Sequence, residues 1–350
     1  MRKKLEKVLL AAAVGPFAIG GSFLRTFSET GRKAACVNSL EYFPIRFGLA
    51  GRVVRRLAQE KIVYRYNRSI RDTALWMKPD LLLIITGNLV RPWVLSQVRE
   101  KLPRTLLVNI HNDDYFSPST GNRFPGLEQS VPLYHWMFPS KRVNVEELRR
   151  LGAEMVHYLP LGYDPAAFYP VRPSRDLFER YRRQLAFFGT CTPERARFLS
   201  ALAGFSLSIW GPGWNRPSLG RALRRQVKRT GNGRSVWGAE LSAILSSARI
   251  GLNFLRSENR DTHNHRSFEL PACGVFTLTQ RSEELANFFV EGKEIACFSS
   301  PAELRDKARY YLEHDRERES IARAGYRRLV EGKHTVRDRV IRMLEIMGLE

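Results

Sequence analysis

Two histidines, an arginine and a glutamate lie close together in the stretch HNHRSFELPACG, residues 263–274. Three kinds of chemistry could use this set. His263 and His265 could bind a metal ion, but no third ligand follows nearby and the pattern HExxH is absent. Arg266 and Glu269 could bind an anionic ligand that carries hydroxyl groups. The same polar groups could also satisfy one another in a loop without binding anything.

An anion and ribose site fits the order of these residues best. A guanidinium holds a phosphate through its planar fork, which suits Arg266. The carboxylate of Glu269 can accept hydrogen bonds from two adjacent sugar hydroxyls. The letters ELPACG predict the first turns of a helix that ends at Gly274, and a helix N-terminus would add backbone N–H groups for a diphosphate. The metal site and the purely structural loop stay open as alternatives.

The first half of the chain alternates between apolar strands and helices. Apolar runs that predict strands are KVLLAAA, KAACVNSLEYF, KPDLLLIITGN, RTLLVNIHNDD and HWMFPSKR. Helices are predicted between them, at 92–101 and 143–151. This alternation indicates βαβ units around a parallel sheet, in which ligands bind beyond the carboxyl ends of the strands. Residues expected along that edge are Gly20, Gly87, His111, Asp113 and Ser140.

The N-terminal sequence MRKKLEKVLLAAAVGPFAIGG has a basic start and a short apolar run, as a signal peptide has. No convincing A-x-A cleavage site follows, so we predict a buried strand from Val8 to Ala13 instead. A loop with Gly20 and Gly21 then leads into a helix that ends near Gly31. No apolar run approaches the roughly 18 residues that a membrane-spanning helix needs.

A segment rich in proline and turn residues, VHYLPLGYDPAAFYPVRPSRD, predicts a linker, after which the pattern restarts. Further predicted strands are QLAFFGT, FSLSIWGPG, ARIGLNFL, VFTLTQ and IACFSS. The segment from Ala302 to Met347 is predicted to be helical throughout. The chain is therefore predicted to be an α/β protein with two Rossmann-like domains, residues 1–170 and 171–335, that face each other across a cleft.

The chain is strongly basic, with a net charge of +22 from 57 Lys and Arg against 35 Asp and Glu in 350 residues. Such a field attracts nucleic acid, anionic membranes or phosphorylated ligands. Residues 46–71 are one basic cluster, and a second cluster follows helical spacing. The second cluster comprises Arg221, Arg224, Arg225, Lys228 and Arg229. Each could be a solvated face, a membrane contact or a nucleic-acid contact, although no zinc finger, RNP-like or GxxG motif supports the last.

Two classes of protein are disfavoured by the patterns that the sequence lacks. The four cysteines are far apart and show no CxxC spacing. This argues against a disulfide framework or a zinc knuckle and fits a reducing compartment. No GxGxxG follows a predicted strand, which argues against a dehydrogenase that binds a dinucleotide.

Four stretches, in order, resemble the C-terminal part of GT-B-fold glycosyltransferases over about Leu148 to Met347. The similarity is greatest to the spore-coat-maturation-like group and lower to the large retaining family of bacterial lipopolysaccharide and glycogen-type transferases. ELRRLGAEMVHYLPLGYDPAAFYP is similar to their interdomain segment, and LAFFGTCTPERARFL to the first strand and glycine turn of their donor domain. NHRSFELPACGVFTLT resembles their R-x-F-E…A-x-G signature, and EGKEIACFSSPAELRDKARYYLEHDRERESIARAGYRRLVEGKHT resembles their terminal run. The first 140 residues share only the general α/β pattern.

This resemblance implies roles for individual residues. Glu269 matches the second glutamate of the family's E-x7-E motif, which binds the nucleotide ribose. Asp261 stands at the first position, near the donor sugar, where the family has glutamate. His111 matches a family histidine near the donor sugar, although it could equally be a satisfied loop histidine. We expect His111 and Asp261 to be the catalytic residues. Residues implied at the donor diphosphate are Gly20, Gly21, Gly189, Thr190, Arg195, Asn264 and Arg266.

The resemblance also implies an activity, the transfer of a sugar from a nucleotide-sugar donor to a glycan, lipid-linked or protein acceptor with retained configuration. Asp113 and Asp114 are adjacent rather than alternating, so no DxD motif indicates a metal, and arginines and loop amides would stabilise the leaving diphosphate. We expect no cofactor, a last helix at 336–350 that crosses back to the first domain, and a cytoplasmic protein with peripheral contact to an anionic membrane. The alternatives are a non-catalytic protein that binds a nucleotide or glycan, and then a nucleic-acid-binding protein.

Overall fold

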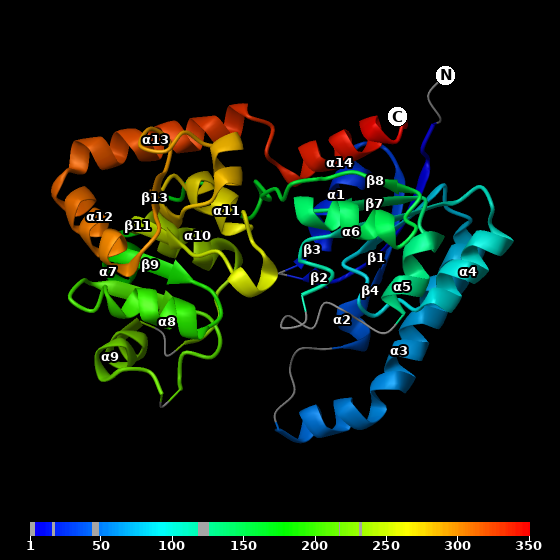
Figure 1. Ribbon diagram of the computed structural model, residues 1–350, viewed down its shortest axis with the longest axis horizontal. Helices are drawn as coiled ribbons and strands as arrows, with labels where there is room; N and C mark the ends of the chain where they lie inside the picture. Colours follow the sequence, from blue (N-terminus) through cyan, green and yellow to red (C-terminus); the bar gives the residue numbers. More distant parts are fainter. Residues whose placement is uncertain (1–3, 16–17, 44–48, 118–125, 217, 231–232) are drawn as a thin grey trace. The chain divides into compact units, whose positions relative to one another are not determined.

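Two compact units make up the computed structural model of the chain, drawn as a ribbon in Figure 1. The structure describes residues 4–15, 18–43, 49–117, 126–216, 218–230 and 233–350, and for 49–58 the backbone alone. Unit 1 comprises Met1–Leu161, Ser257–Asp261 and Val336–Glu350. Unit 2 comprises Gly162–Arg256 and Thr262–Thr335. The boundary after Leu161 lies inside the segment that was predicted to be a linker.

Unit 1 is built on a six-stranded parallel sheet with the strand order β4-β1-β5-β6-β7-β8. Its strands are β1 (Lys7–Ala12), β4 (Lys33–Asn38), β5 (Leu81–Ile85), β6 (Leu106–His111), β7 (Trp136–Pro139) and β8 (Met155–Val156). The apolar runs are buried because helices cover both faces of a parallel sheet, and every residue from Leu81 to Ile84 has no exposed surface. The N-terminal strand predicted at Val8 to Ala13 is confirmed within one residue at each end.

Helices lie on both faces of this sheet (Figure 1). On one face, α1 (Gly20–Glu29) and α14 (Val336–Ile346) share an apolar cluster that includes Phe27 and Met343. On the other, α3 (Leu49–Met77) and α4 (Pro92–Lys101) share a second cluster. The last helix therefore packs on the first unit, as predicted. The shorter helices are α2 (Ser39–Tyr42), α5 (Leu127–Ser130), the 3-10 helix η1 (Val131–Leu133) and α6 (Arg142–Arg150).

A short hairpin, β2 (Val14–Gly15) and β3 (Ala18–Ile19), connects β1 to α1. Gly20 and Gly21 were predicted to lie in a loop, and this was wrong, because they are the first two residues of α1. A Cβ on Gly20 would lie 2.3 Å from the carbonyl oxygen of Ala13. The helix thus begins so close to the end of β1 that only glycine fits there.

Unit 2 contains a five-stranded parallel sheet with the order β10-β9-β11-β12-β13. Its strands, each inside a predicted apolar run or one residue beyond it, are β9 (Arg183–Phe188), β10 (Leu207–Trp210), β11 (Ala248–Asn253), β12 (Phe276–Gln280) and β13 (Ala296–Phe298). Its helices are α7 (Arg175–Tyr181), α8 (Pro193–Ser200), α9 (Arg221–Thr230), α10 (Gly238–Ser246), α11 (Arg266–Ala272), the 3-10 helix η3 (Glu283–Asn287), α12 (Pro301–Glu313) and α13 (Asp315–Glu331). The sequence predicted one continuous helical segment from Ala302 to Met347. That was wrong, because the helix breaks at His314 and again before Val336, where the chain passes into unit 1.

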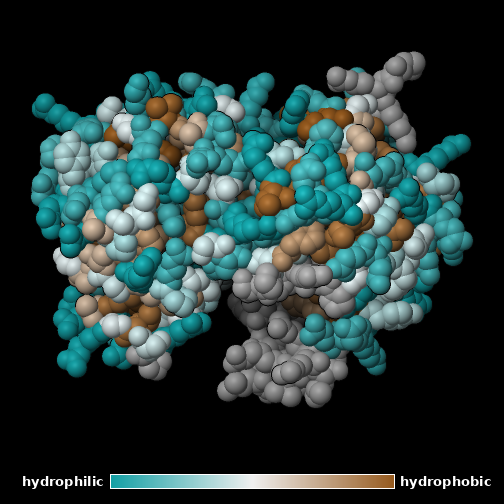
Figure 2. Space-filling model, viewed as in Figure 1, coloured by the Kyte–Doolittle hydropathy of each residue, from teal (hydrophilic) through white to brown (hydrophobic). Residues whose placement is uncertain are grey.

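The face of the molecule in Figure 2 is mostly hydrophilic over α12 and α13, with hydrophobic residues in small patches. Among the described residues, no helix combines the length and the apolar character needed to cross a membrane. The cysteines are free thiols, of which Cys191, Cys273 and Cys297 are buried.

Candidate active site

The stretch HNHRSFELPACG forms the start of α11 in unit 2. The side-chain oxygen of Asn264 accepts a hydrogen bond from the backbone N–H of Ser267 at 3.2 Å, and the Ser267 hydroxyl accepts one from the backbone N–H of Asn264 at 3.2 Å. This is the reciprocal cap of a helix N-terminus. Nδ2 of Asn264 also donates to the carbonyl of Phe254, just after β11, at 3.1 Å. Asn264 therefore fixes the start of α11 against the end of the sheet.

Arg266 and Glu269 lie one turn apart on α11 and form an ion pair. The guanidinium of Arg266 lies 5.9 Å from the centre of the Phe188 ring, and its Nε is buried without a hydrogen-bond partner among the described residues. Burial, and then the positive charge of Arg195, lower the pKa of Arg266 to about 10. The guanidinium stays charged at neutral pH, and at least one of its donors lacks an acceptor.

Arg195, on α8, connects the loop after β9 to the end of β11. Its Nη1 donates to the carbonyl of Thr190 at 3.1 Å, and its Nη2 donates to the carbonyl of Phe254 at 3.2 Å. Asn264 donates to the same Phe254 carbonyl. Thr190, Arg195 and Asn264 are therefore one connected group at the carboxyl edge of the unit 2 sheet, where parallel sheets bind ligands.

Two glycine turns pack against each other at this edge. A Cβ on Gly189, which follows β9, would lie 2.9 Å from Cζ of Phe187 and 3.1 Å from Nη1 of Arg195. A Cβ on Gly211, which follows β10 with φ of +125°, would lie 2.4 Å from the carbonyl oxygen of Gly189. Gly211 requires glycine because the two loop backbones are in contact, and Gly189 favours it because two side chains pack over its Cα. The sequence singled out Gly189 and missed Gly211, which lies in the run FSLSIWGPG.

In unit 1, His111 is the last residue of β6 and has no exposed surface. Its Nδ1 lies 2.9 Å from the carbonyl oxygen of Asp113, its Nε2 lies 3.2 Å from Oδ1 of Asn88, and its ring lies 4.0 Å from that of Tyr115. Burial lowers the pKa of His111 to about 4, so the imidazole is neutral at pH 7. These contacts fit the satisfied loop histidine, and the catalytic role of His111 stays a prediction.

Asp261 belongs to Ser257–Asp261, the short segment that the chain contributes to unit 1. Its carboxylate lies 2.8 Å from Nζ of Lys141, and the two side chains are only 2% and 1% exposed. Nδ2 of Asn259 donates to the same carboxylate at 2.6 Å. Asp261 therefore neutralises a buried lysine. Its predicted place beside the donor sugar stays a prediction, and the structure adds a structural role that the sequence did not indicate.

Arg260, which precedes Asp261 in the same segment, was not among the site residues predicted from the sequence. Its guanidinium donates from Nη2 to Asp114 at 2.6 Å and from Nη1 to Glu147 at 2.8 Å. Burial alone would raise the pKa of Asp114, but hydrogen bonds from Arg260 and Asn144 outweigh it and lower that pKa. In the sequence, the adjacent acids Asp113 and Asp114 were examined for a metal motif. In the structure, Asp114 binds Arg260, which lies 146 positions away in the chain.

The two histidines of the stretch have separate partners within unit 2. His263 is buried, with Nδ1 3.1 Å from Glu284 and its ring against Phe268 and Phe288. Nδ1 of His265 lies 3.4 Å from the carbonyl oxygen of Gly162. In the part of the chain that the structure describes, no group of three or more His, Cys, Asp or Glu side chains could hold a metal ion.

Comparison with known families identifies the second half of the chain. Residues 183–345 match the family model described as glycosyl transferase-like. This stretch is therefore similar to the glycosyl transferase-like family. The prediction of a glycosyltransferase is thereby confirmed at the level of the enzyme class. The finer resemblance to the spore-coat-maturation-like group stays a prediction. A search of curated proteins finds no match.

Solved structures similar to the whole chain confirm the predicted fold. Sucrose-phosphate synthase from Thermosynechococcus elongatus has a TM-score of 0.67 at 12% identity, with 98% of each chain covered. Anabaena HepE in complex with UDP-glucose has a TM-score of 0.63 at 14% identity, covering 98% of this chain and 99% of that one. A UDP-N-acetylglucosamine 2-epimerase from Listeria monocytogenes has a TM-score of 0.58 at 13% identity, covering 99% and 96%. At such low identity these likenesses show the fold alone, two Rossmann-like halves of GT-B type.

Proposed function

We propose that this protein transfers a sugar from a nucleotide-sugar donor to a glycan, lipid-linked or protein acceptor, with retention of configuration and without a metal ion. One observation carries the proposal. A group of polar side chains lies at the carboxyl edge of the unit 2 sheet, inside the stretch that matches the glycosyl transferase-like model; two of them share the Phe254 carbonyl and the other two form an ion pair. Its members are Arg195, Asn264, Arg266 and Glu269. The UDP-glucose in the structure of HepE supports a nucleotide sugar as the ligand of this fold.

The charges of this group suit the reaction. Transfer of a sugar leaves growing negative charge on the departing diphosphate, which preorganised cations stabilise best. Arg266 is partly buried and its pKa is lowered to about 10, first by burial and further by Arg195, so the negative charge of an approaching phosphate would stabilise its charged form. Glu269 would accept the two hydroxyls of the ribose.

Donor binding would rearrange one contact in particular. In the free protein, Arg266 and Glu269 neutralise each other. A nucleoside diphosphate would replace this ion pair by two contacts, one from Arg266 to a phosphate oxygen and one from the ribose to Glu269. The pair thus keeps both side chains at the site until the donor arrives.

The roles proposed for unit 1 rest on the positions of Gly20 and His111. Gly20 brings the start of α1 to the carboxyl end of β1, and His111 stands at the carboxyl end of β6 in the same parallel sheet. We assign the acceptor to this unit, because the resemblance assigns the donor to the other. We also propose a location in the cytoplasm with peripheral contact to anionic lipid. Three cations support this contact, because Lys61, Arg65 and Arg68 are exposed on one face of α3.

Calorimetry with UDP, GDP, ADP and TDP tests the donor site on the wild type, on Glu269→Ala and on the control Glu283→Ala, which alters an exposed glutamate of unit 2. Selective binding of one nucleotide, lost in Glu269→Ala alone, is the expected result. Equal binding by all three proteins would remove Glu269 from the site.

Product analysis with the matching nucleotide sugar then separates the possible activities. Transfer to an acceptor supports the proposal. Conversion of the donor sugar into an epimer would indicate the activity named for the Listeria structure. Tight nucleotide binding without any product would indicate the non-catalytic alternative, whose motive is the aspartate at position 261 where the family has glutamate.

A further inference from the structure

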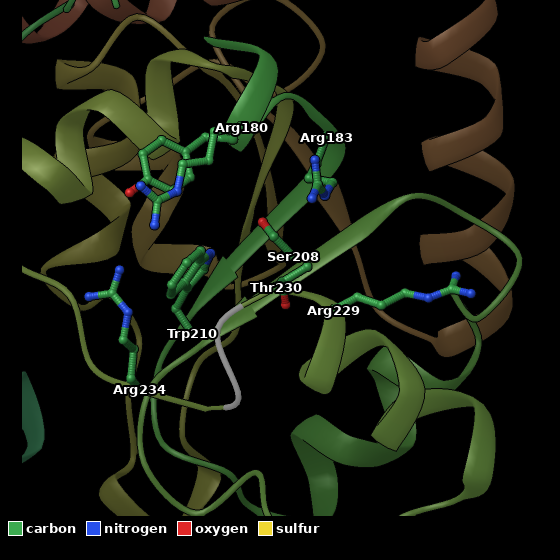
Figure 3. Close-up of a pocket in the computed structure, with 8 residues that line it drawn as sticks. Arg180, Arg183, Ser208, Trp210, Arg229, Thr230 and Arg234 are labelled. Carbon is green, nitrogen blue, oxygen red and sulfur yellow. The ribbon is translucent and has the colours of Figure 1, made fainter. Parts of the chain in front are cut away.

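A second polar pocket lies in unit 2, against the edge strand β10, with a volume of about 220 Å³ (Figure 3). Its walls come from the end of α7, the first residue of β9, two buried residues of the edge strand β10, the end of α9 and Arg234. The lining residues are Arg180, Tyr181, Arg183, Ser208, Trp210, Arg229, Thr230 and Arg234.

The residues that line this pocket differ from those of the proposed donor site. Arg183 is the first residue of β9, whereas Gly189 follows the last residue of that strand. At roughly 3.3 Å per residue, the two ends of β9 lie about 20 Å apart. The pocket therefore begins at the amino end of β9 and reaches the carboxyl end of β10 at Trp210, whose carbonyl accepts the backbone N–H of Gly189 at 2.9 Å.

The pocket carries an excess of positive charge. Of its four guanidiniums, that of Arg234 is bonded to Glu240, with Nη1 to Oε2 at 3.0 Å. No ion pair with a carboxylate involves Arg180, Arg183 or Arg229 among the described residues. Arg183 donates only to the carbonyl of its neighbour Arg182. Three cationic groups around one small pocket thus have no carboxylate within ion-pair distance among the described residues, and their combined field attracts an anion.

Internal contacts hold the pocket in shape. The hydroxyl of Tyr181 donates to Glu240 at 2.7 Å, and the Glu240-bound Arg234 lies 5.1 Å from the centre of the Trp210 ring. The hydroxyl of Thr230 accepts a hydrogen bond from the backbone N–H of Ile209 at 3.2 Å. This side chain therefore occupies part of the open edge of β10, where another strand could have paired. The arginines are therefore arranged around a fixed floor.

Trp210 offers a neutral donor at the same place. Its side chain is 5% exposed, and its Nε1 is buried without a hydrogen-bond partner among the described residues. In Figure 3 the nitrogen edge of the indole is turned toward the middle of the labelled group, on the side of Ser208. A buried N–H without an acceptor is unfavourable, so this donor also points to a ligand with acceptor oxygens.

We propose that this pocket is a second anion site, which binds a phosphoryl group independently of the nucleotide donor. Guanidinium forks match phosphate oxygens in geometry and charge, and the indole N–H adds one donor. α9 also presents the exposed, helically spaced cations that the sequence predicted, and it leads to Arg229 at the rim. The field of α9 would draw an anionic ligand toward the pocket.

Binding of inorganic phosphate, measured by calorimetry and by ³¹P line broadening at low salt, tests this proposal. Arg180→Gln/Arg229→Gln removes two pocket cations, and Arg221→Gln/Arg224→Gln removes two from α9 outside the pocket. We expect the pocket variant to weaken binding about tenfold or more, since each charge-assisted bond contributes that much, and the control to change it less than about threefold. Trp210→Phe keeps an aromatic ring but removes the indole N–H, and it should weaken binding several-fold. Thermal unfolding checks that all three variants fold.

Competition identifies the carrier of the phosphoryl group. Displacement by glycerol 3-phosphate would indicate a soluble phosphate ester. Binding of phosphatidylglycerol vesicles that the pocket variant alone loses would indicate a lipid headgroup. Three results would overturn the proposal: no phosphate binding, equal losses in the pocket variant and the α9 control, or displacement of phosphate by the nucleotide that binds at Glu269. Each can occur whether or not the protein transfers sugar, so the two proposals fail separately.

Discussion

Replacement of Asp261 by asparagine separates the two roles assigned to this residue. As a catalytic group beside the donor sugar, Asp261 would be needed for transfer and not for stability. As the partner of Lys141, it would be needed for stability first. Asparagine keeps the size and shape of the side chain and removes only the charge, so the difference between the two outcomes reflects the ion pair.

The expected magnitude follows from burial. The side chains of Lys141 and Asp261 are 1% and 2% exposed, and their charged atoms lie 2.8 Å apart. Removal of one partner from such a pair leaves a buried charge without compensation, at a cost of roughly 3–5 kcal/mol. Asp72 pairs with Arg68 and Arg71 on α3 but is 49% exposed, so Asp72→Asn in the same unit should cost about 1 kcal/mol or less.

Urea unfolding followed by circular dichroism measures both variants, with the first transition compared if the two units unfold separately. The double variant Asp261→Asn/Lys141→Met should recover most of the lost stability, because no unpaired charge remains. Transfer activity is then compared at a temperature at which all variants are folded. An Asp261→Asn protein of unchanged stability and abolished transfer would refute the structural role and restore the catalytic one.

Two further predictions concern single residues. The pKa of His111 is lowered to about 4 in the folded protein against roughly 6.5 unfolded, so acid favours the unfolded state, and about 3 kcal/mol of stability should be lost as the pH falls from 7 to 4. His111→Gln should flatten this pH dependence in urea midpoints, and an unchanged slope would contradict the burial argument. Gly211→Ala should lower the melting temperature and weaken nucleotide binding, because its Cβ would meet the carbonyl oxygen of Gly189 at 2.4 Å. The control Gly220→Ala, which has no atom within 4 Å of the new Cβ, should do neither.

Local sequence patterns predicted the fold where burial alone decides it. The strands of both parallel sheets could be found because their residues are buried on both faces and form unbroken apolar runs, as at Leu81 to Ile85. The break between α13 and α14 could not be found from apolar runs. The signal there is a glycine and not an apolar run: Gly332 caps α13, and the chain passes into unit 1 at Val336.

The candidate site was predicted only in part for the same reason. Thr190, Arg195 and Asn264 lie at predicted strand and helix ends, so their common location follows from the rule for parallel sheets. The pairing of Asp261 with Lys141 joins residues 120 positions apart. No local sequence pattern indicates this pairing, since an Asp and a Lys at these positions would look the same in a solvated loop.

The charges around Arg266, at the carboxyl edge of the unit 2 sheet, favour the binding of an anionic ligand. Burial, and then the positive charge of Arg195, lower the pKa of Arg266, and among the described residues its ion-pair partner is Glu269. A nucleoside diphosphate carries more negative charge than one carboxylate and should therefore raise the pKa of Arg266 when it binds. A lysine at this position would hold its charge less firmly and lack the planar fork. Arg266→Lys should consequently weaken nucleotide diphosphate binding in calorimetry, and it should weaken it more at pH 9 than at pH 7. Equal affinity of wild type and Arg266→Lys at both pH values would show that Arg266 does not contact the diphosphate.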